Sequence, residues 1–202
     1  MPAILTRKSF THAVKIDLGL FKGEFVQVLS RFTWELPQTV IGNIYSHYRN
    51  IKWTVDKVRY FDGATFLINE RSKKDDGVTL GNYININIKD SYDRSIYEPD
   101  WNGGRFTIIG GDPIFMHEYG HYIQSQQYGL GYLFSIGLRS IKSAANSTVE
   151  STLYDANGNF IANRTTHSLY WTETSANKKA AKYFGIWYRV NWAGDRFYQY
   201  PL

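Results

Sequence analysis

Two histidines and a glutamate share one short stretch of the chain. In the sequence MHEYGH, His117 and His121 stand four residues apart, and Glu118 lies between them. Residues four apart share one face of an α-helix, so both imidazoles can bind the same metal ion. Glu118 is rotated by about 100° from His117 and flanks that ion, where a general base can take a proton from water. The stretch therefore predicts a hydrolytic zinc site.

The same residues also have a purely structural interpretation. His117 and His121 can be ordinary polar residues on a helix face, with no metal between them. If they are buried together with Glu118, each of the three side chains then needs hydrogen-bond partners from the protein. We favour the metal site because the motif lies in a segment with a helical pattern that follows a strand with one polar face.

Two histidines do not complete a catalytic zinc site, which needs a third protein ligand. The chain has no cysteine, so this ligand must be His, Asp or Glu. We favour Glu173, which is predicted to lie within a helix over 166–185. Asn177 follows one turn later and can accept a hydrogen bond from the ring N–H of a ligand histidine. His167 is the rival ligand, or else caps this helix or contacts substrate. The other downstream candidates are Glu150, Asp155 and Asp195.

The composition fits one globular domain over residues 1–202. The chain is 43% hydrophobic and 20% charged, and its net charge is +5. Its Lys and Arg residues are scattered, so we expect no nucleic-acid partner. The first 21 residues lack the features of a signal peptide, and the most apolar stretch, 128–138, is too short to span a membrane. These features leave the localisation open between the cytoplasm and export as part of a larger effector.

The pattern of elements predicts an α+β fold. Helical spacing on both sides of Pro37 predicts two helices within about 23–50. Segment 54–89 is rich in β-branched and aromatic residues and has turns at 62–63 and 71–77, which predicts a sheet. The expected catalytic region, about 112–185, contains three helices and one hairpin. These are a helix from Asp112 to near Gly129, a helix over about 131–144, a hairpin around Asn157-Gly158, and a helix over 166–185 that Thr166 caps and Gly185 ends.

The motif HEYGH, followed by a helix that carries WTETSAN, resembles the gluzincin branch of zinc metallopeptidases. This resemblance implies that His117, His121 and Glu173 bind zinc and that Glu118 is the general base. It also implies a zincin-like fold, in which a small, mainly antiparallel sheet packs on an active-site helix and a C-terminal ligand helix, with helices at the N-terminus.

One position departs from the gluzincin pattern. The family usually has Asp where this chain has Asn177, and an amide lacks the charge that makes a ligand histidine more basic. This departure bears on catalytic efficiency and leaves the expected zinc binding unchanged. His167 and Tyr170 are candidates, by position, for stabilising the transition state.

The zincin resemblance also suggests a role for the stretch GNYININI at 81–88. Its isoleucines alternate with Asn85 and Asn87, which predicts a strand with one apolar face and one amide face open to water or a ligand. Zincins pair substrate with an edge strand, and 81–88 is our candidate for that strand. The alternative is an ordinary amphipathic strand within the sheet.

A longer resemblance covers much of the chain. The stretches LSRFTWELPQTVIGNIYSH, GATFLINE, LGNYININI and MHEYGHYIQSQ are similar to metallopeptidase domains at the C-terminal ends of bacterial Rhs-type polymorphic toxins. This resemblance implies an effector-like domain that acts on a peptide or protein substrate and has an immunity or inhibitor protein as partner.

The predicted function is hydrolysis of peptide bonds by a zinc-dependent peptidase. One alternative is a catalytically degenerate, zinc-containing module that binds another protein. Another is a different metallohydrolase, such as an amidase acting on cell-wall peptides, which would use the same site residues. Replacing Glu118 by Gln separates the enzyme from the binding module, because only the enzyme needs this carboxylate.

Overall fold

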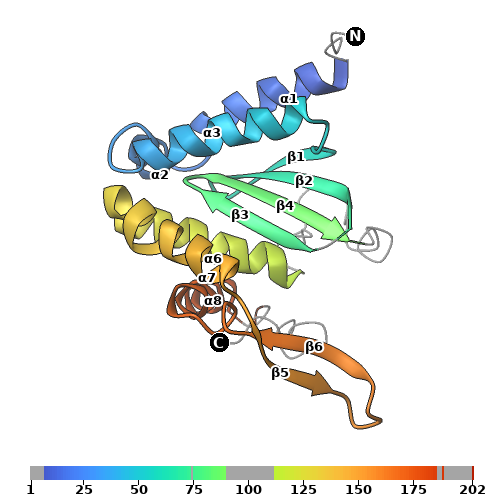
Figure 1. Cartoon of the computed structure of the whole chain (residues 1–202). Coiled ribbons are helices and arrows are strands. Elements are labelled where there is room, and N and C mark those ends of the chain that lie inside the picture. Colours follow the sequence, from blue (N-terminus) through green and yellow to red (C-terminus); the bar gives the residue numbers. More distant parts are fainter. Residues whose placement is uncertain (1–6, 74, 90–111, 186–187, 189–201) are drawn as a thin grey trace. The chain divides into compact units, whose positions relative to one another are not determined.

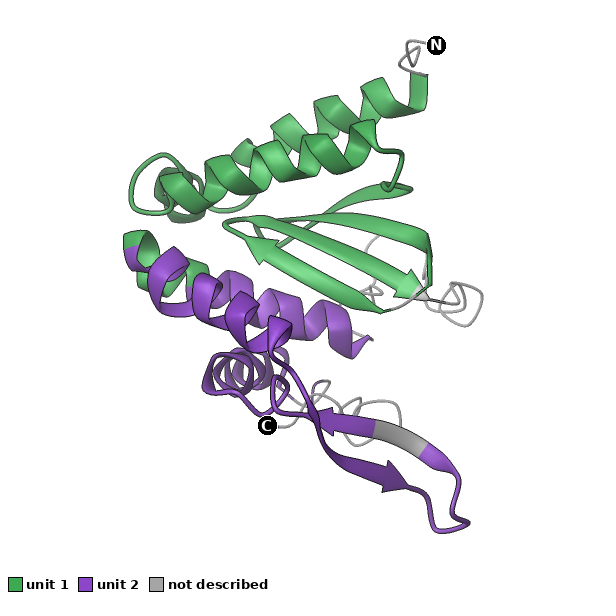
Figure 2. Ribbon diagram, in the orientation of Figure 1, with its two compact units in different colours: residues 1–95, 125–130 green, residues 96–124, 131–202 purple. Residues whose placement is uncertain are grey.

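The chain has an α+β fold, as the sequence predicts (Figure 1). The computed structural model describes residues 7–73, 75–89, 112–185, 188 and 202. It divides into two compact units, of which unit 1 holds residues 1–95 and 125–130 and unit 2 holds residues 96–124 and 131–202 (Figure 2). Among the described residues, no helix is long and apolar enough to cross a membrane.

Unit 1 begins with helices. They are α1 (Arg7–Leu18), the short 3-10 helix η1 (Gly19–Phe21), α2 (Phe25–Arg31) and α3 (Leu36–Ile51). The two helices predicted around Pro37 are confirmed, and Pro37 lies in the first turn of α3, where its missing N–H has no helical partner to lose. Helix α1 was not predicted, although Phe10, Val14 and Leu18 recur in it at four-residue intervals.

The sheet of unit 1 has four strands in the order β1-β2-β4-β3. Their bounds are β1 Lys57–Phe61, β2 Ala64–Ser72, β3 Asp76–Leu80 and β4 Tyr83–Lys89. β2 pairs with β4 in parallel, whereas β1–β2 and β3–β4 are antiparallel pairs. The sheet is thus mixed, with two antiparallel pairs among its three.

The prediction that 81–88 forms an edge strand is wrong. Gly81 has a φ of +59°, and Gly81 and Asn82 form a tight turn that folds β3 back onto β4. β4 therefore has a hydrogen-bonded neighbour on each side and lies inside the sheet. Its backbone has no free edge with which to pair a substrate.

The predicted open amide face of β4 is also wrong, because α3 covers it. The Asn85 side-chain amide donates to the Ser46 hydroxyl at 3.4 Å, and the Arg49 guanidinium donates to the Asn87 side-chain oxygen at 2.7 Å. The isoleucines on the other face of β4 are also buried. The alternation is real, but both faces of β4 lie in the interior of unit 1.

Unit 2 contains the predicted catalytic helices. Its elements are α6 (Pro113–Tyr128), the π-helical turn η3 (Leu133–Gly137), α7 (Leu138–Ala145), β5 (Val149–Tyr154), β6 (Phe160–Thr165) and α8 (Trp171–Phe184). The last turn of α6 and most of the 3-10 helix η2 (Gly129–Gly131) that follows it belong to unit 1. The hairpin around Asn157-Gly158 is confirmed as β5–β6.

Three of the four predicted helix ends are confirmed, including the end of α6 at Tyr128, next to Gly129. The Asp112 carboxylate accepts a hydrogen bond from the Ile114 N–H at 2.9 Å and so caps α6, and Gly185 ends α8 with a φ of +59°. The prediction that Thr166 caps the last helix is wrong. Its N–H donates to the Thr148 carbonyl at 2.9 Å, which extends the hairpin, and α8 begins only at Trp171.

A buried arginine holds separate segments of unit 1 together. Arg31, at the end of α2, has no solvent-exposed surface. Its guanidinium donates to the carbonyls of Gly19, Leu20 and Gly63 at 3.0, 2.8 and 2.6 Å. The first two carbonyls belong to η1 and the third to the turn between β1 and β2, so one side chain joins three parts of the chain.

Replacing Arg31 by Met should destabilise the protein strongly. The substitution keeps much of the side-chain volume but leaves three carbonyls without this donor, which should lower the free energy of unfolding by about 3 kcal/mol. Urea denaturation of the purified variant measures this loss. The control, Arg7→Met at the exposed start of α1, should stay within about 0.5 kcal/mol of wild type. Equal stabilities of the two variants would contradict the role given to Arg31.

Candidate metal centre

Helices α6 and α8 run antiparallel within unit 2 and come unusually close. A Cβ atom built on Gly120 would lie 2.1 Å from the backbone oxygen of Ala176, a distance that real side chains do not reach. Further along the same pair of helices, Met116 packs with Ala180 in a buried cluster. The glycine of HEYGH thus lets the two backbones approach, and this approach sets how the side chains between the helices meet.

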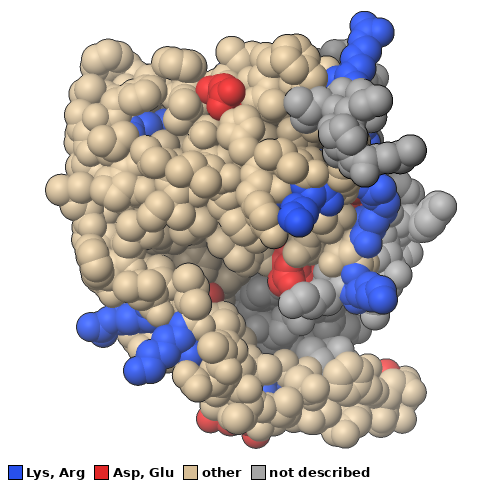
Figure 3. Space-filling model, turned by 45° about the horizontal axis from the view of Figure 1, so that its top comes forward, with Lys and Arg blue, Asp and Glu red and all other residues tan. Residues whose placement is uncertain are grey.

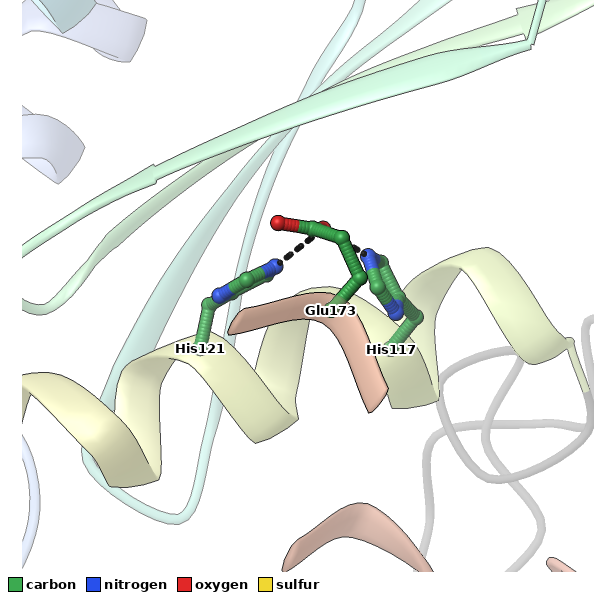
Figure 4. Close-up of side chains that lie close together, drawn as sticks. All are labelled: His117, His121 and Glu173. Atoms are coloured by element: carbon green, nitrogen blue, oxygen red, sulfur yellow. Dashed lines mark hydrogen bonds and ion pairs between the residues drawn. The ribbon is translucent and has the colours of Figure 1, made fainter. Parts of the chain in front are cut away.

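His117, His121 and Glu173 meet between these helices (Figure 4). Glu173 Oε2 lies 3.3 Å from His117 Nε2 and 3.0 Å from His121 Nε2, and the three ligand atoms lie within 4.8 Å of one another. All three residues are at most 6% exposed. The group could therefore hold a metal ion.

The other ring nitrogen of each histidine faces an amide oxygen. His117 Nδ1 lies 2.6 Å from Asn177 Oδ1, and His121 Nδ1 lies 2.7 Å from Gln124 Oε1. The Gln124 NH₂ group donates to the Thr172 carbonyl at 2.9 Å, which fixes this amide with its oxygen toward the ring. An amide oxygen only accepts, so each imidazole carries a proton on Nδ1.

In this arrangement, hydrogen-bond acceptors of the histidines and of Glu173 face one another. A neutral imidazole protonated at Nδ1 presents a lone pair at Nε2, and both Nε2 atoms face the Glu173 carboxylate. The Thr172 hydroxyl donates to the other carboxylate oxygen at 2.7 Å, so Oε2 is the oxygen turned to the histidines. Three acceptors at this spacing need a cation between them, either protons or a metal ion.

The donor set fits zinc. Zn²⁺ takes imidazole nitrogen and carboxylate oxygen at about 2.0–2.1 Å, and tetrahedral angles then place neighbouring ligand atoms about 3.3 Å apart. The two distances from Glu173 Oε2, 3.3 and 3.0 Å, are close to that spacing, while the separations within the whole group extend to 4.8 Å. The hydrogen bonds at both Nδ1 atoms supply the support that ligand histidines usually have.

Without a metal, protons provide the positive charge. Burial alone would lower the pKa of His121, but the Glu173 carboxylate, with smaller contributions from Glu118 and Gln124, raises this pKa to about 9. Burial alone would raise the pKa of Glu173, and the two histidines instead hold it far below its usual range. The metal-free centre is thus an imidazolium–carboxylate ion pair at neutral pH.

His167 lies next to the three residues but outside their tight group. Its Nε2 is 3.8 Å from Glu173 Oε2, and its Nδ1 lies 3.2 Å from the Ser143 hydroxyl in α7. Its side chain is 28% exposed, far more than those of the three buried residues. Burial lowers the pKa of His167, and the Glu173 charge offsets part of this effect. The structure therefore places Glu173, and not His167, directly between His117 and His121.

The remaining site residues expected from the sequence make other contacts, are exposed, or lie outside the described residues. Tyr170 precedes the first turn of α8, its ring lies against Trp171, and no described contact joins its hydroxyl to the centre. Glu150 is exposed on β5. The Asp155 carboxylate accepts hydrogen bonds at 2.8 Å from the backbone and side chain of its own turn, at Asn157 and Asn159. Asp195 lies outside the described residues.

Three residues of the centre were missed by the sequence reasoning. Gln124 and Thr172 orient His121 and Glu173, and Gly120 allows the helices to approach. A glycine inside a helix costs stability, so Gly120 could have pointed to close packing. Nothing in the local pattern marks Gln124 or Thr172, because their contact joins residues 48 positions apart.

Replacing Gly120 by Ala should damage the centre. The methyl group overlaps the Ala176 carbonyl, so the helices must separate and the free energy of unfolding should fall by about 1–3 kcal/mol. The matched control is Gly137→Ala, where the nearest atom would lie 3.8 Å from the new Cβ. That control should leave stability unchanged or raise it by up to about 1 kcal/mol. Urea denaturation distinguishes them, and a Gly120→Ala variant as stable as the control would contradict the close approach.

The metal-free protein should lose stability as pH rises. The pKa of His121 in the folded state, about 9, lies above its ordinary value of 6.5, so its contribution is complete below pH 6.5 and disappears as pH rises through about 9. Thermal unfolding in the presence of a chelator, from pH 6 to 10, measures this slope. The variant His121→Gln should show a clearly smaller decline. Parallel pH profiles for wild type and variant would contradict the ion pair.

A comparison of the chain with protein-family models, with curated protein sequences and with solved structures finds no match. The basis for assigning a function is therefore the arrangement of the side chains in unit 2.

Proposed function

We propose that the chain is a zinc-dependent peptidase of zincin-like fold, in which His117, His121 and Glu173 hold one zinc ion. The observation that carries this proposal is the convergence of two imidazole lone pairs and a carboxylate oxygen whose orientations are fixed by hydrogen bonds. Three protein ligands with a fourth position left open are typical of catalytic zinc sites, whereas structural sites have four. Zinc bound there supplies Lewis-acid chemistry, which polarises a carbonyl and makes water more acidic.

Glu118 is the general base in this proposal. It follows the ligand His117 on α6, is 5% exposed, and its charge acts on the imidazoles of both His121 and His167. Its carboxylate takes one proton from the attacking water while the water oxygen bonds to the peptide carbonyl carbon. When the C–N bond breaks, Glu118 gives that proton to the leaving amine, so the residue returns to its starting state.

His167 is the candidate for stabilising the oxyanion that forms on the carbonyl oxygen. Its Nε2 lies at the edge of the centre, 3.8 Å from Glu173, and its partly exposed side chain is accessible to a substrate. The Ser143 hydroxyl at Nδ1 orients the ring. An N–H donor fixed before the reaction is the kind of group that stabilises developing negative charge. Tyr170 is a weaker candidate, since its described contacts involve Trp171 and the start of α8.

Asn177 makes this centre less basic than one with a carboxylate in its place. Its amide oxygen accepts from His117 Nδ1 at 2.6 Å, so it orients the ring as a carboxylate would. It carries no charge, however, and so lacks the charge with which a carboxylate would strengthen His117 as a ligand. We expect zinc to bind and the turnover rate to be modest.

The substrate class in this proposal is a peptide or protein. The toxin or effector context, and an immunity or inhibitor protein as partner, stay predictions from the Rhs-type resemblance. A catalytically degenerate, zinc-containing binding module is the alternative function, and it needs His117, His121 and Glu173 but not Glu118.

Replacing Glu118 by Gln should abolish hydrolysis and keep zinc. The amide has nearly the same shape but cannot take the proton, so cleavage of a peptide-library substrate by the zinc-loaded protein should fall by about 10²–10⁴-fold. Zinc content, measured on the same sample, should stay at the wild-type level. The control Glu150→Gln removes an exposed carboxylate of β5 and should leave both quantities unchanged.

Two results would contradict this proposal. Cleavage by Glu118→Gln at the wild-type rate would remove Glu118 from the reaction. A wild-type protein that binds zinc but cleaves no member of a broad peptide library would favour the binding module.

A further inference from the structure

The outward face of α3 is apolar along its whole length. It carries six large side chains that recur at steps of three or four residues, apart from one adjacent pair, namely Leu36, Val40, Ile41, Ile44, Tyr48 and Ile51. Each is between 43% and 63% exposed. A helix at the surface of a globular protein normally turns such a stripe toward the core and its polar side toward water. Helix α3 does the reverse.

The buried side of α3 is polar and is held in place by specific contacts. Arg49 donates to Asn87 of β4 and to the Thr54 carbonyl, at 2.7 and 3.2 Å. A Cβ atom on Gly42 would lie 2.2 Å from the Leu80 carbonyl oxygen, so only glycine fits at this contact. Turning α3 to bury its apolar stripe would break these contacts. The outward apolar face therefore belongs to the folded state of unit 1.

The apolar surface continues onto α2. Phe25, Val26, Leu29 and Phe32 are between 41% and 78% exposed, and the Phe32 ring lies 5.8 Å from that of Phe21 in η1. We call the ten outward side chains of α2 and α3 the apolar face. Figure 3 shows mostly uncharged side chains over the upper part of the view, with isolated acidic and basic side chains among them.

Between Phe25 and Ile51, no exposed Lys, Arg, Asp or Glu lies among the side chains of the apolar face. Charge appears at its borders, where Lys52 Nζ lies 5.7 Å from the centre of the Tyr48 ring and the exposed Asp17 pairs with His47. Between Phe25 and Ile51 the charged residues are Arg31, Glu35 and Arg49, and all three are buried. Glu35 accepts hydrogen bonds from the hydroxyls of Ser30 and Ser125 in the interior of unit 1. Protein interfaces show the same depletion of charge at their centres, most strongly in homodimers.

The size of the apolar face suits a stable protein interface. Side chains of these types, half exposed, each present on the order of 100 Å², so ten of them present roughly 1,000 Å². The largest apolar patch on a typical monomer is about 300–600 Å². A standard interface buries about 800 Å² on each partner.

The scarcity of charged side chains on the apolar face indicates which kind of partner it fits. Binding to an anionic membrane surface relies on Lys and Arg around the apolar side chains, and a partner of opposite charge needs charges to recognise. An uncharged apolar face is complementary to itself, because two copies bring no like charges together. We propose that two copies of this chain associate through their apolar faces. This dimer does not depend on the proposed peptidase activity.

The test measures the mass of the purified chain by light scattering after size-exclusion chromatography. Wild type should have twice the chain mass of 23.4 kDa. Ile44→Glu places a charge in the apolar face and should give a monomer with an unchanged circular dichroism spectrum. The matched control is Ile141→Glu in α7, which replaces an isoleucine of similar exposure, 59% against 63%, and should remain a dimer.

A second measurement applies if Ile44→Glu does not fold. The chain has no cysteine, so Ile44→Cys and Ile141→Cys each carry a single thiol. A short bis-maleimide reagent should cross-link only Ile44→Cys into dimers. A monomeric wild type at millimolar concentration, including one that sediments with lipid vesicles, would overturn the proposal, as would a dimer that Ile44→Glu leaves intact.

Discussion

The hydrogen bond from the Gln124 amide to the Thr172 carbonyl is the contact on which the candidate metal centre depends. It turns the Gln124 oxygen toward His121, places the ring proton on Nδ1 and so directs the Nε2 lone pair at Glu173. Asn177 acts in the same way on His117. These contacts exist because Gly120 lets α6 and α8 approach within backbone contact. The chemistry of the centre thus follows from how closely two helices pack.

The group of His117, His121 and Glu173 could be predicted in part because the spacing within each helix is local. His117 and His121 share a helix face at any four-residue interval, and Glu173 with Asn177 repeats this spacing on α8. Which of Glu173 and His167 comes closest to the histidines could not be derived from spacing, since it depends on where α8 begins. The chain continues the hairpin through Thr166 and starts the helix at Trp171, which places Glu173 in the first turn.

The error over the amide face of β4 has a physical cause. A period of two indicates that a strand has two different faces, but it does not reveal what covers each face. Asn85 and Asn87 look like surface residues, yet Ser46 and Arg49 of α3 supply their hydrogen-bond partners in the interior. The same hydrogen bonds between α3 and β4 explain why α3 turns its apolar side outward. Polar residues are buried on one side of the helix, so apolar residues remain on the other.

Zinc analysis of wild type beside Glu173→Gln tests the metal centre most directly. After zinc loading and removal of free metal, wild type should hold about one zinc per chain, and the variant should lose most of it because a neutral amide is a poor ligand. Asp17→Asn is the control, since Asp17 also pairs with a histidine, His47 at 2.8 Å, but on the surface. It should keep the wild-type zinc content. A wild type without zinc, or equal zinc in Glu173→Gln, would contradict the assignment of these three residues as its ligands.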